Sequence, residues 1–324
     1  MTSLTDLKDI KAARAELPAY IRRTPIFPLA RESAEIGSER CFLKCENLQV
    51  TGAYKVRAAF TVLNSLPKAA RSKGIVLSSS GNFAQAFAYV GRMMGVPITV
   101  VMLDQASAYK VQATQGHGGE VYFCGTEAAA RQSIVEQLAI DRGMTAIDTW
   151  EEPPITAGHG TMGLEIVEDF NDVQQVLVPV SSGGGAAGIA TAVKEMRSDV
   201  KVIGVQPERA NAAYVSLERG KLTTIDYWDS IADGLSAVRP GAFPFRHIQH
   251  YLDEIVLISE EDIANAFCTL LERVKIVGEP AGVAAAAGFL AGKVNTSLTT
   301  VAMVTGGNVT TETMQWLLVM AERS

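Results

Sequence analysis

The amino-acid sequence predicts an α/β protein with open, mostly parallel sheets. Short apolar runs rich in Val and Ile alternate with longer segments of helical periodicity, which is the pattern of repeated βα units. Three of the short runs end in loops of Ser, Gly or Thr that lead into a helix, at residues 78–82, 181–185 and 305–308. Because open α/β sheets bind ligands beyond the carboxyl ends of their strands, these loops are the candidate ligand-binding segments.

Apolar runs bounded by turn residues predict the strands, and apolar positions that recur every three or four residues predict the helices. In the first half of the chain, strands are expected at 41–45, 75–79, 98–103, 120–123 and 144–147, and helices from 55 onward and over 82–94, 110–115 and 127–142. In the second half, strands are expected at 176–180, 201–205 and 300–305, and helices at 186–196 and 310–320. Residues 282–292 are nearly uncharged but too few to cross a bilayer, so they predict a buried helix.

Composition narrows the classes of function. The 324 residues suffice for one large or two medium domains, and a hydrophobic content of 48% supports a sizeable core. The 29 Lys and Arg form no basic block and are outnumbered by 35 Asp and Glu, so no nucleic-acid partner is expected. The first nine residues are too charged for a signal peptide, and no apolar segment is long enough for a membrane span. The expected location is therefore the cytoplasm, without a membrane partner.

The cysteines give no sign of a metal site. None of the four, Cys41, Cys45, Cys124 and Cys268, belongs to a C-x-x-C pair, and no histidine has ligand spacing around them. A zinc site is therefore not expected. Free thiols in a reducing compartment are the simplest interpretation.

Lys55 is the candidate nucleophile. The strand predicted at 41–45 leads into a Thr-Gly turn, and a helix with an apolar face follows, which places Lys55 in the first turn of that helix. The positive end of the helix dipole and partial burial both disfavour an ammonium there, so the amine is poised to attack a carbonyl carbon. Taken alone, a lysine is more often a solvated surface residue. The three loops downstream are what favour the functional interpretation.

Among the loops, 181–185 is the best candidate phosphate site. Its three glycines lead at once into an alanine-rich helix, so backbone N–H groups and the helix N-terminus can both approach an anion. The chain contains neither G-x-x-x-x-G-K-[ST] nor a G-x-G-x-x-G after a strand. A nucleotide-binding function therefore has little support.

Residues 44–57 resemble the lysine motif of the fold type II pyridoxal-phosphate enzymes, and the closest group is the threonine/serine dehydratase and serine racemase family. The segments 79–82, 179–185, 157–161, 232–234, 278–282 and 305–309 are also similar to family segments, in the family's order and spacing. The resemblance covers nearly the whole chain. It implies two open, mostly parallel α/β domains like those of the tryptophan synthase β subunit, with the cofactor in the cleft between them.

The resemblance also implies a domain organisation and partners. Residues 1–70 and 150–324 would form a large cofactor-binding domain, and residues 71–149 a small mobile domain that closes over the substrate. The implied cofactor is pyridoxal 5′-phosphate, and the implied partner is a small-molecule amino-acid substrate. A homodimer is expected from the same resemblance.

Each site residue is carried over from the family motif that it matches. Lys55 would hold the cofactor covalently, Asn82 would contact its 3′ oxygen, and Thr305 would lie against its pyridine nitrogen. The remaining cofactor-binding residues would be Ser181, Ser182, Gly183, Gly184, Gly185 and Glu279. The substrate-binding residues would be Ser79, Ser80, Gly81, Asn82, Phe83, Arg131 and Trp150.

The reaction implied by the resemblance is β-elimination. The amino acid would displace Lys55 from the cofactor, and the freed amine would take the α-proton as a general base. The β-hydroxyl would then leave, protonated by the cofactor phosphate, and the enamine would hydrolyse to a 2-oxo acid and ammonia. The cofactor carries the difficult step, while the protein supplies orientation and electrostatics.

Two other functions stay open. In racemases of this family a serine at the position of Ser80 acts as a second base opposite the lysine, so an amino-acid racemase using Lys55 and Ser80 is the first alternative. Trp150 favours the lyase, because dehydratases commonly have an aromatic residue there. A non-catalytic protein that binds the cofactor or an amino acid is the second alternative, and the intact Lys55, Asn82 and Thr305 argue against it.

The chain departs from the family pattern in four places. Ala53-Tyr54 replaces Ser-Phe before the lysine, Phe83 replaces a histidine, Ser181 and Ser182 replace two loop glycines, and Ala58 replaces a glycine. Serine hydroxyls can still donate to a phosphate. The implied substrate is a β-hydroxy amino acid such as threonine, serine or a bulkier analogue, and Phe83, which makes the substrate pocket more apolar, favours one that is bulkier than threonine or different from it.

A cation site that some family members build from carboxylates is not expected here. Gln206 and Ala212 stand at the matching positions, and Glu208 is better explained as a solvated charge. Because hard cations need several oxygen ligands, the sequence predicts a weak cation site or none.

Overall fold

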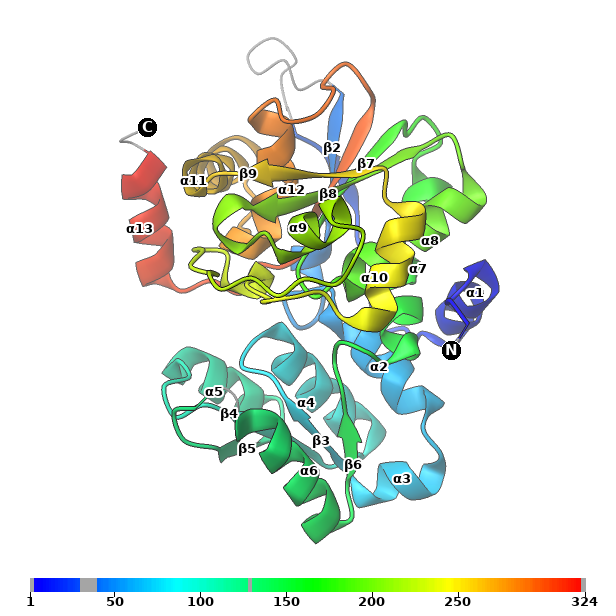
Figure 1. The fold of residues 1–324 in the computed structure, drawn as a ribbon, viewed down its shortest axis with the longest axis vertical. Helices are drawn as coiled ribbons and strands as arrows, with labels where there is room; N and C mark the ends of the chain where they lie inside the picture. Colours follow the sequence, from blue (N-terminus) through cyan, green and yellow to red (C-terminus); the bar gives the residue numbers. More distant parts are fainter. Residues whose placement is uncertain (1–2, 30–39, 128–129, 322–324) are drawn as a thin grey trace.

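The computed structural model describes residues 3–29, 40–127 and 130–321 and has an α/β architecture with two sheets (Figure 1). Among these residues, one sheet has six strands in the order β1-β2-β10-β7-β8-β9, and the other has four in the order β5-β4-β3-β6. Figure 1 shows the two sheets one above the other, with α2 near their junction. The fold class predicted from the sequence is confirmed.

The larger sheet is parallel except at one edge. Its strands are β1 (Ile26–Pro28), β2 (Cys41–Cys45), β7 (Gln175–Pro179), β8 (Lys201–Pro207), β9 (Glu254–Ile258) and β10 (Thr300–Val304). Only β1 pairs antiparallel, with β2. The strands β7 and β10 are buried along their whole length, which explains why they read as continuous apolar runs rather than alternating ones.

The smaller sheet is parallel throughout. Its strands are β3 (Ile75–Ser78), β4 (Ile98–Met102), β5 (Glu120–Phe123) and β6 (Thr145–Ile147). Both sheets therefore direct the carboxyl ends of their central strands into the loops that precede helices, as expected for ligand sites in this architecture.

The helices complete the βα units. They are α1 (Leu7–Glu16), α2 (Lys55–Ser65), α3 (Lys68–Lys73), α4 (Asn82–Met94), α5 (Ala108–Gly116), α6 (Ala130–Arg142), α7 (Pro153–Asp169), α8 (Gly184–Met196), α9 (Ala212–Glu218), α10 (Ala242–Tyr251), α11 (Glu260–Thr269), α12 (Pro280–Leu290) and α13 (Thr311–Ala321). The predicted buried helix at 282–292 corresponds to α12, whose first ten residues are buried. Residues 128–129 of the helix predicted at 127–142 lie outside the described residues.

Helix α7 was not predicted from periodicity, and its burial explains why. Residues 155–167 are buried around the whole helix, so no polar face marks a period. The available signal was the Pro153-Pro154 pair, because proline is favoured in the first turn of a helix. Glycines on α7 and α8 let the two backbones touch: a Cβ at Gly188 would lie 2.2 Å from the Thr156 carbonyl oxygen.

Each sheet has its own hydrophobic core. The larger core surrounds the six-stranded sheet, and a second core includes apolar residues of α2, α4 and the four-stranded sheet. Helix α2 contacts both α4 and α7, so the segment that begins with Lys55 joins the two halves. The boundaries predicted near residues 70 and 150, and the mobility of the smaller unit, stay predictions.

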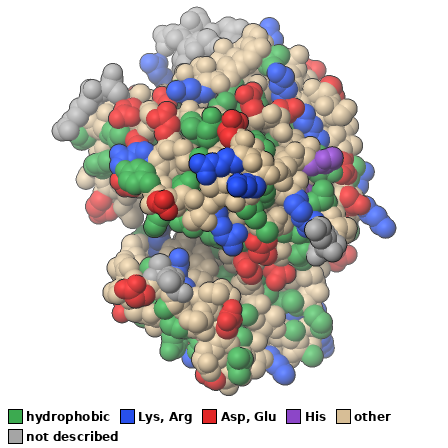
Figure 2. All heavy atoms as spheres, viewed as in Figure 1, with side chains coloured by type: hydrophobic (Ala, Val, Ile, Leu, Met, Phe, Trp, Pro, Cys, Tyr) green, Lys and Arg blue, Asp and Glu red, His purple; other side chains and the backbone are tan. Residues whose placement is uncertain are grey.

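Charged side chains of both signs are interspersed on the face drawn in Figure 2. This agrees with the modest net charge of −6. Over the described ranges, every helix is too short or too polar to span a membrane.

Candidate active site

Lys55 is the first residue of α2, as predicted, and the loop before it is fixed to the end of β10. Ala53 forms an antiparallel bridge with Gly306, and the Tyr54 N–H donates to the Thr305 carbonyl at 3.1 Å. The Gly307 N–H donates to the Gly52 carbonyl at 2.9 Å. Two of the predicted loops, far apart in sequence, therefore form one backbone platform.

The Lys55 amine is half-buried among aromatic side chains. Its Nζ donates to the Tyr54 hydroxyl at 2.6 Å and lies 4.2 Å from the centroid of the same ring. It lies 4.4 Å from the centroid of the Phe83 ring, which comes from the first turn of α4. The two departures from the family pattern at positions 54 and 83 are thus both in contact with the amine.

Asn82 connects three of the loops through hydrogen bonds. Its Nδ2 donates to Glu279 Oε1 at 2.6 Å, and its Oδ1 accepts from Asn308 Nδ2 at 2.8 Å. Asn308 Nδ2 also donates to the Thr51 carbonyl at 2.9 Å. Glu279 Oε1 fills the space beside Gly306, where an added Cβ would lie only 2.2 Å from it. Asn308 was part of a quoted motif but was not predicted as a site residue.

The 181–185 loop is shaped by its glycines. Gly183 has φ of 105°, a left-handed conformation that disfavours any side chain, and α8 begins at the next residue. A Cβ at Gly183 would lie 2.8 Å from Ile248 Cδ1, and one at Gly185 would lie 2.9 Å from the Tyr54 hydroxyl oxygen. The N-terminus of α8 and the Lys55 amine therefore both lie close to one tyrosine hydroxyl.

His159 on α7 is a buried polar residue beside this loop. The residue is fully buried, and neither ring nitrogen has a hydrogen-bond partner within the described residues. Burial, with the nearby charges of Lys55 and Arg57, holds the pKa of His159 well below its ordinary value, so the ring is neutral. Its ring centroid lies 4.5 Å from that of Tyr54.

These features fit the cofactor that the sequence resemblance implies. The helix dipole at the N-terminus of α8 favours a phosphate, and the glycines there carry no side chain over the backbone N–H groups that would bind it. A buried imidazole without a partner among the described residues lies at the same place. The half-buried Lys55 amine stands beside it, as an aldehyde-bearing cofactor requires.

The other predicted substrate residues lie in two places. Ser79, Ser80 and Gly81 form the turn between β3 and α4, beside Asn82 and Phe83. Gly241 connects the Trp150 segment to the glycine loop. Its N–H donates to the Ser182 carbonyl at 2.8 Å, and a Cβ at Gly241 would lie 2.8 Å from the Trp150 carbonyl oxygen.

Arg131 lies in the first turn of α6, next to Cys124 beyond the edge strand β5. Burial raises the pKa of the Cys124 thiol, and the Arg131 charge opposes that effect. The predicted contact of Arg131 with the substrate carboxylate stays a prediction.

A buried ion network anchors the first turn of α2 and was not predicted. Arg57 donates to both oxygens of Glu46, at 2.8 and 3.0 Å, and to both oxygens of Glu165, at 2.8 and 3.0 Å. Lys44 donates to Glu165 at 2.6 Å, and the Thr24 hydroxyl donates to Glu46 at 2.6 Å. Burial alone would raise the pKa of Glu165, but the Arg57 and Lys44 charges hold it below its ordinary value. The two positive and two negative charges balance.

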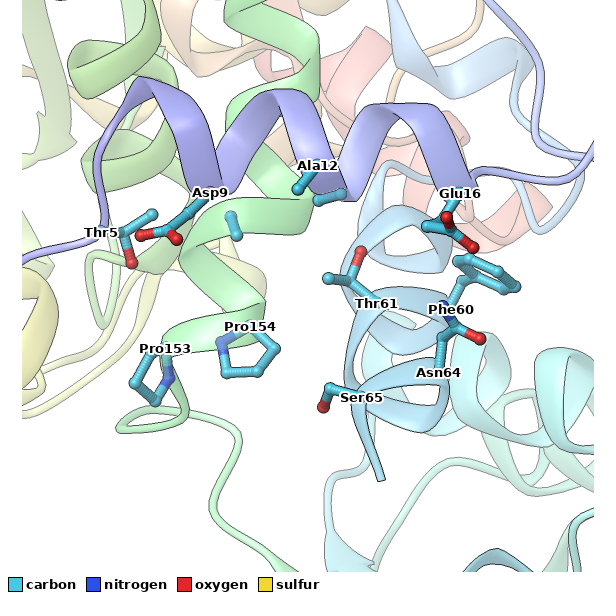
Figure 3. Close-up of a pocket in the computed structure, with 12 residues that line it drawn as sticks. Thr5, Asp9, Ala12, Glu16, Phe60, Thr61, Asn64, Ser65, Pro153 and Pro154 are labelled. Atoms are coloured by element: carbon cyan, nitrogen blue, oxygen red, sulfur yellow. The ribbon is translucent and has the colours of Figure 1, made fainter. Parts of the chain in front are cut away.

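A surface pocket of about 340 Å³ lies between α1, α2 and the start of α7 (Figure 3). Phe60 and Thr61 of α2 line it together with Pro153 and Pro154 of α7. None of the predicted site residues lines this pocket. It is therefore separate from the Lys55 cluster.

Glu279 should make stability depend on pH in this region. Burial, reinforced by the Asp233 charge, raises the pKa of Glu279 to about 7 from an ordinary value of 4.5. Between these two values the unfolded chain has already lost a proton that the folded chain keeps, so the free energy of unfolding falls as pH rises through this window.

We expect Glu279→Gln to remove this loss of stability. Glutamine keeps an oxygen for the Asn82 amide but has no carboxyl proton to lose. As pH rises from 4.5 to 7, the free energy of unfolding of the variant should therefore rise relative to that of the parent, by up to about 3 kcal/mol. Urea unfolding of the cofactor-free proteins at about pH 5 and about pH 8 measures the difference. The exposed Glu218→Gln change is the control. A stability difference that is the same at both pH values would contradict the expectation.

Comparisons with known proteins agree with this geometry. Residues 17–306 match the family model described as pyridoxal-phosphate dependent enzyme. The chain is 38% identical over 310 residues to the catabolic L-threonine dehydratase TdcB of Staphylococcus aureus (strain USA300), covering 94% of this chain and 90% of that protein. The solved processed form of threonine deaminase isoform 2 from Solanum lycopersicum superposes with a TM-score of 0.91 at 26% identity, covering 99% of this chain and 96% of that one. The serine racemase of Dictyostelium discoideum gives 0.88 at 32%, covering 95% and 100%.

These matches extend over almost the whole chain and include Lys55, the 78–82 loop and the 181–185 loop. The structural neighbours include both threonine deaminases and serine racemases, as the motifs predicted. The chain belongs to the pyridoxal-phosphate dependent enzyme family, in the fold type II group of threonine dehydratases and serine racemases.

Proposed function

We propose that the protein is a lyase that removes water from a β-hydroxy amino acid and releases a 2-oxo acid and ammonia. The observation that carries the proposal is the placement of the Lys55 amine, half-buried in the first turn of α2 and bonded to a hydroxyl that lies against the glycine loop of α8. The 38% identity to an L-threonine dehydratase supports the same reaction class.

The residues of the site divide the work. When bound, pyridoxal phosphate supplies the electron sink that acidifies the α-carbon of an amino acid. The backbone N–H groups of 181–185, at the N-terminus of α8, hold the phosphate. Asn82 and Thr305 orient the cofactor ring, and Glu279 orients the Asn82 amide.

Lys55 is the general base of the proposed reaction. Its amine takes the α-proton while the turn at 79–81, at the N-terminus of α4, holds the substrate carboxylate. With the carboxylate fixed there, the β-hydroxyl leaves as water. Holding the substrate carboxylate in place keeps the α-proton next to the Lys55 amine. This alignment of the reacting groups supplies much of the rate enhancement.

The expected substrate is bulkier and more apolar than threonine. Phe83, whose ring centroid lies 4.4 Å from the Lys55 amine and 5.9 Å from the Phe87 ring, presents an aromatic face where the family pattern has a histidine. A phenyl ring packs well against apolar groups and, unlike the imidazole of histidine, has no ring nitrogen to hydrogen-bond to a polar one.

A screen of β-hydroxy amino acids for 2-oxo acid release tests this function. We expect β-phenylserine or β-hydroxyleucine to give a higher kcat/KM than threonine or serine. Phe83→His, which restores the family residue, should instead favour threonine or serine. The ratio of kcat/KM between the bulky and the small substrates should fall by about tenfold or more, since a misplaced apolar group costs about 1–3 kcal/mol. If none of these amino acids yields a 2-oxo acid, the lyase proposal is wrong.

Racemisation is the alternative function, and it is supported by the similarity to a solved serine racemase at 32% identity. Incubation with one pure enantiomer separates the two functions, because a racemase yields the mirror-image amino acid and a lyase yields ammonia. Ser80→Ala should abolish any racemisation and leave elimination of the L-substrate intact. Loss of both activities would refute the assignment of Ser80 as the second base.

The proposal extends to the location, the oligomeric state and the domain motion of the enzyme. We place it in the cytoplasm as a homodimer that acts on small amino acids rather than on nucleic acid or membranes. Closure of the 71–149 unit over the substrate would exclude water from the reaction. Sedimentation of the purified protein tests the dimer, and limited proteolysis with and without substrate tests the closure.

A further inference from the structure

The Tyr54 hydroxyl lies close to both the Lys55 amine and the glycine loop of α8. Its hydroxyl oxygen accepts a hydrogen bond from Lys55 Nζ at 2.6 Å. The same oxygen lies against the first turn of α8, 2.9 Å from where a Cβ on Gly185 would be. A single polar atom therefore touches the reactive amine and borders the phosphate site.

The ring of Tyr54 is held in place by its neighbours. It packs against the buried His159 ring with a centroid distance of 4.5 Å and an interplanar angle of 42°. The Tyr54 backbone is fixed as well, because its N–H donates to the Thr305 carbonyl at 3.1 Å. The hydroxyl has little freedom to leave the space between Lys55 and α8, since the packing of the ring fixes its direction.

The hydroxyl is an addition relative to the family pattern, which has phenylalanine before the lysine. Phenylalanine supplies the same ring and the same packing without a proton donor. The packing role of residue 54 therefore does not require the hydroxyl. A polar atom placed against an amine in a half-buried site has a direct chemical effect on that amine.

We propose that the Tyr54 hydroxyl is a catalytic group, which carries a proton between the Lys55 amine and the phosphate bound at the N-terminus of α8. The inference rests on the proposed lyase function. After Lys55 has taken the α-proton, an N–H bond of its ammonium breaks and the proton goes to the Tyr54 oxygen. At the same time the O–H bond of Tyr54 breaks and that proton goes to a phosphate oxygen.

The transfer restores each group for the next step. Lys55 returns to the neutral amine and Tyr54 ends as it began, so the proton taken from the α-carbon would become available where the phosphate binds, for the departing hydroxyl. No oxidant or further reactant takes part. Because the two proton movements are simultaneous, the Tyr54 oxygen carries a proton throughout the transfer.

Tyr54→Phe is the matched variant, because it removes only the hydroxyl and installs the family residue. The control is Tyr122→Phe, which removes a partly exposed hydroxyl on the edge strand β5. The first measurement is calorimetric titration of the cofactor-free proteins with inorganic phosphate. We expect Tyr54→Phe to bind phosphate about tenfold more weakly, the effect of one lost hydrogen bond to a charged group, and Tyr122→Phe to bind like the parent.

The second measurement is steady-state kinetics with saturating cofactor on the best substrate from the screen. A lost proton carrier should lower kcat by about 10- to 100-fold and leave KM within about threefold, because substrate binding does not use the hydroxyl. Borohydride reduction and peptide mapping at Lys55 confirm that both proteins carry the cofactor equally.

The two measurements separate this inference from the function on which it rests. Unchanged phosphate affinity or unchanged kcat in Tyr54→Phe overturns the role of the hydroxyl, while the lyase function stands. If the parent protein releases no 2-oxo acid at all, the lyase proposal fails. A phosphate affinity that is then the same in the parent and in Tyr54→Phe also removes the hydroxyl from the phosphate site.

Discussion

Replacing Lys55 by alanine is expected to lower the rate of 2-oxo acid release by at least about 10³-fold, with no comparable loss of stability. The amine serves twice in the proposed reaction, as the covalent anchor of the cofactor and as the base for the α-proton. Each role contributes about 10²- to 10⁴-fold when it is lost. A factor of 10³ corresponds to about 4 kcal/mol of transition-state stabilisation.

Lys55→Arg separates the chemistry of the amine from its charge. Arginine keeps a cation and hydrogen-bond donors for the Tyr54 hydroxyl, but a guanidinium does not condense with an aldehyde. We therefore expect Lys55→Arg to be as inactive as Lys55→Ala. Borohydride reduction followed by peptide mapping should place the pyridoxyl group on Lys55 in the parent and on neither variant.

The control for general effects of removing a lysine is Lys68→Ala at the exposed start of α3. It should keep full activity and full cofactor content. Activity of Lys55→Arg within tenfold of the parent would contradict covalent anchoring, whatever the behaviour of the alanine variant.

Local patterns were enough to predict the position of Lys55 and the three loops. A Thr-Gly turn followed by apolar spacing fixes where α2 begins, and glycine runs after apolar strands fix the loops, so neighbours in sequence contain the information. Helix α7 was not predicted, because a helix that is buried on every side has no polar face and so shows no helical periodicity of apolar residues. The edge strand β1 and the strand β9 were also missed.

Contacts between distant side chains could not be read from the sequence. Asn308 donates to Asn82 across 226 residues, and Arg57 donates to Glu165 across 108 residues, so both pairs exist only once the two sheets are assembled. The contact of Tyr54 with the amine next to it depends on the direction of its side chain, which packs against His159 from a distant part of the chain. The residue types were visible, but their partners depend on tertiary packing.

The buried network around Arg57 should be the most sensitive point for stability. Arg57→Leu would leave the carboxylates of Glu46 and Glu165 with only one buried cation, Lys44, between them. Removing one partner of a buried ion pair costs about 3–5 kcal/mol, because the remaining charge stays desolvated. We expect a loss of that size in the apparent free energy of unfolding, measured by urea titration of the cofactor-free protein with circular dichroism.

The same substitution at the surface provides the matched control. Arg23 also pairs with carboxylates, those of Glu168 and Asp169, but its side chain is exposed to solvent. Exposed pairs contribute about 0–1 kcal/mol, so Arg23→Leu should have little effect. Equal losses in the two variants would show that burial of the network is not the source of its contribution.

A second substitution distinguishes charge imbalance from lost packing. In the parent protein the network holds two cations and two carboxylates, and Arg57→Leu leaves a net negative charge inside the protein. Adding Glu46→Gln restores neutrality while Lys44 and Glu165 stay paired at 2.6 Å. If the uncompensated charge dominates, the double variant should regain at least half of the lost stability, since a neutral amide is far less costly to bury than a carboxylate. No recovery would mean that the hydrogen bonds of the guanidinium, rather than its charge, hold the first turn of α2 in place.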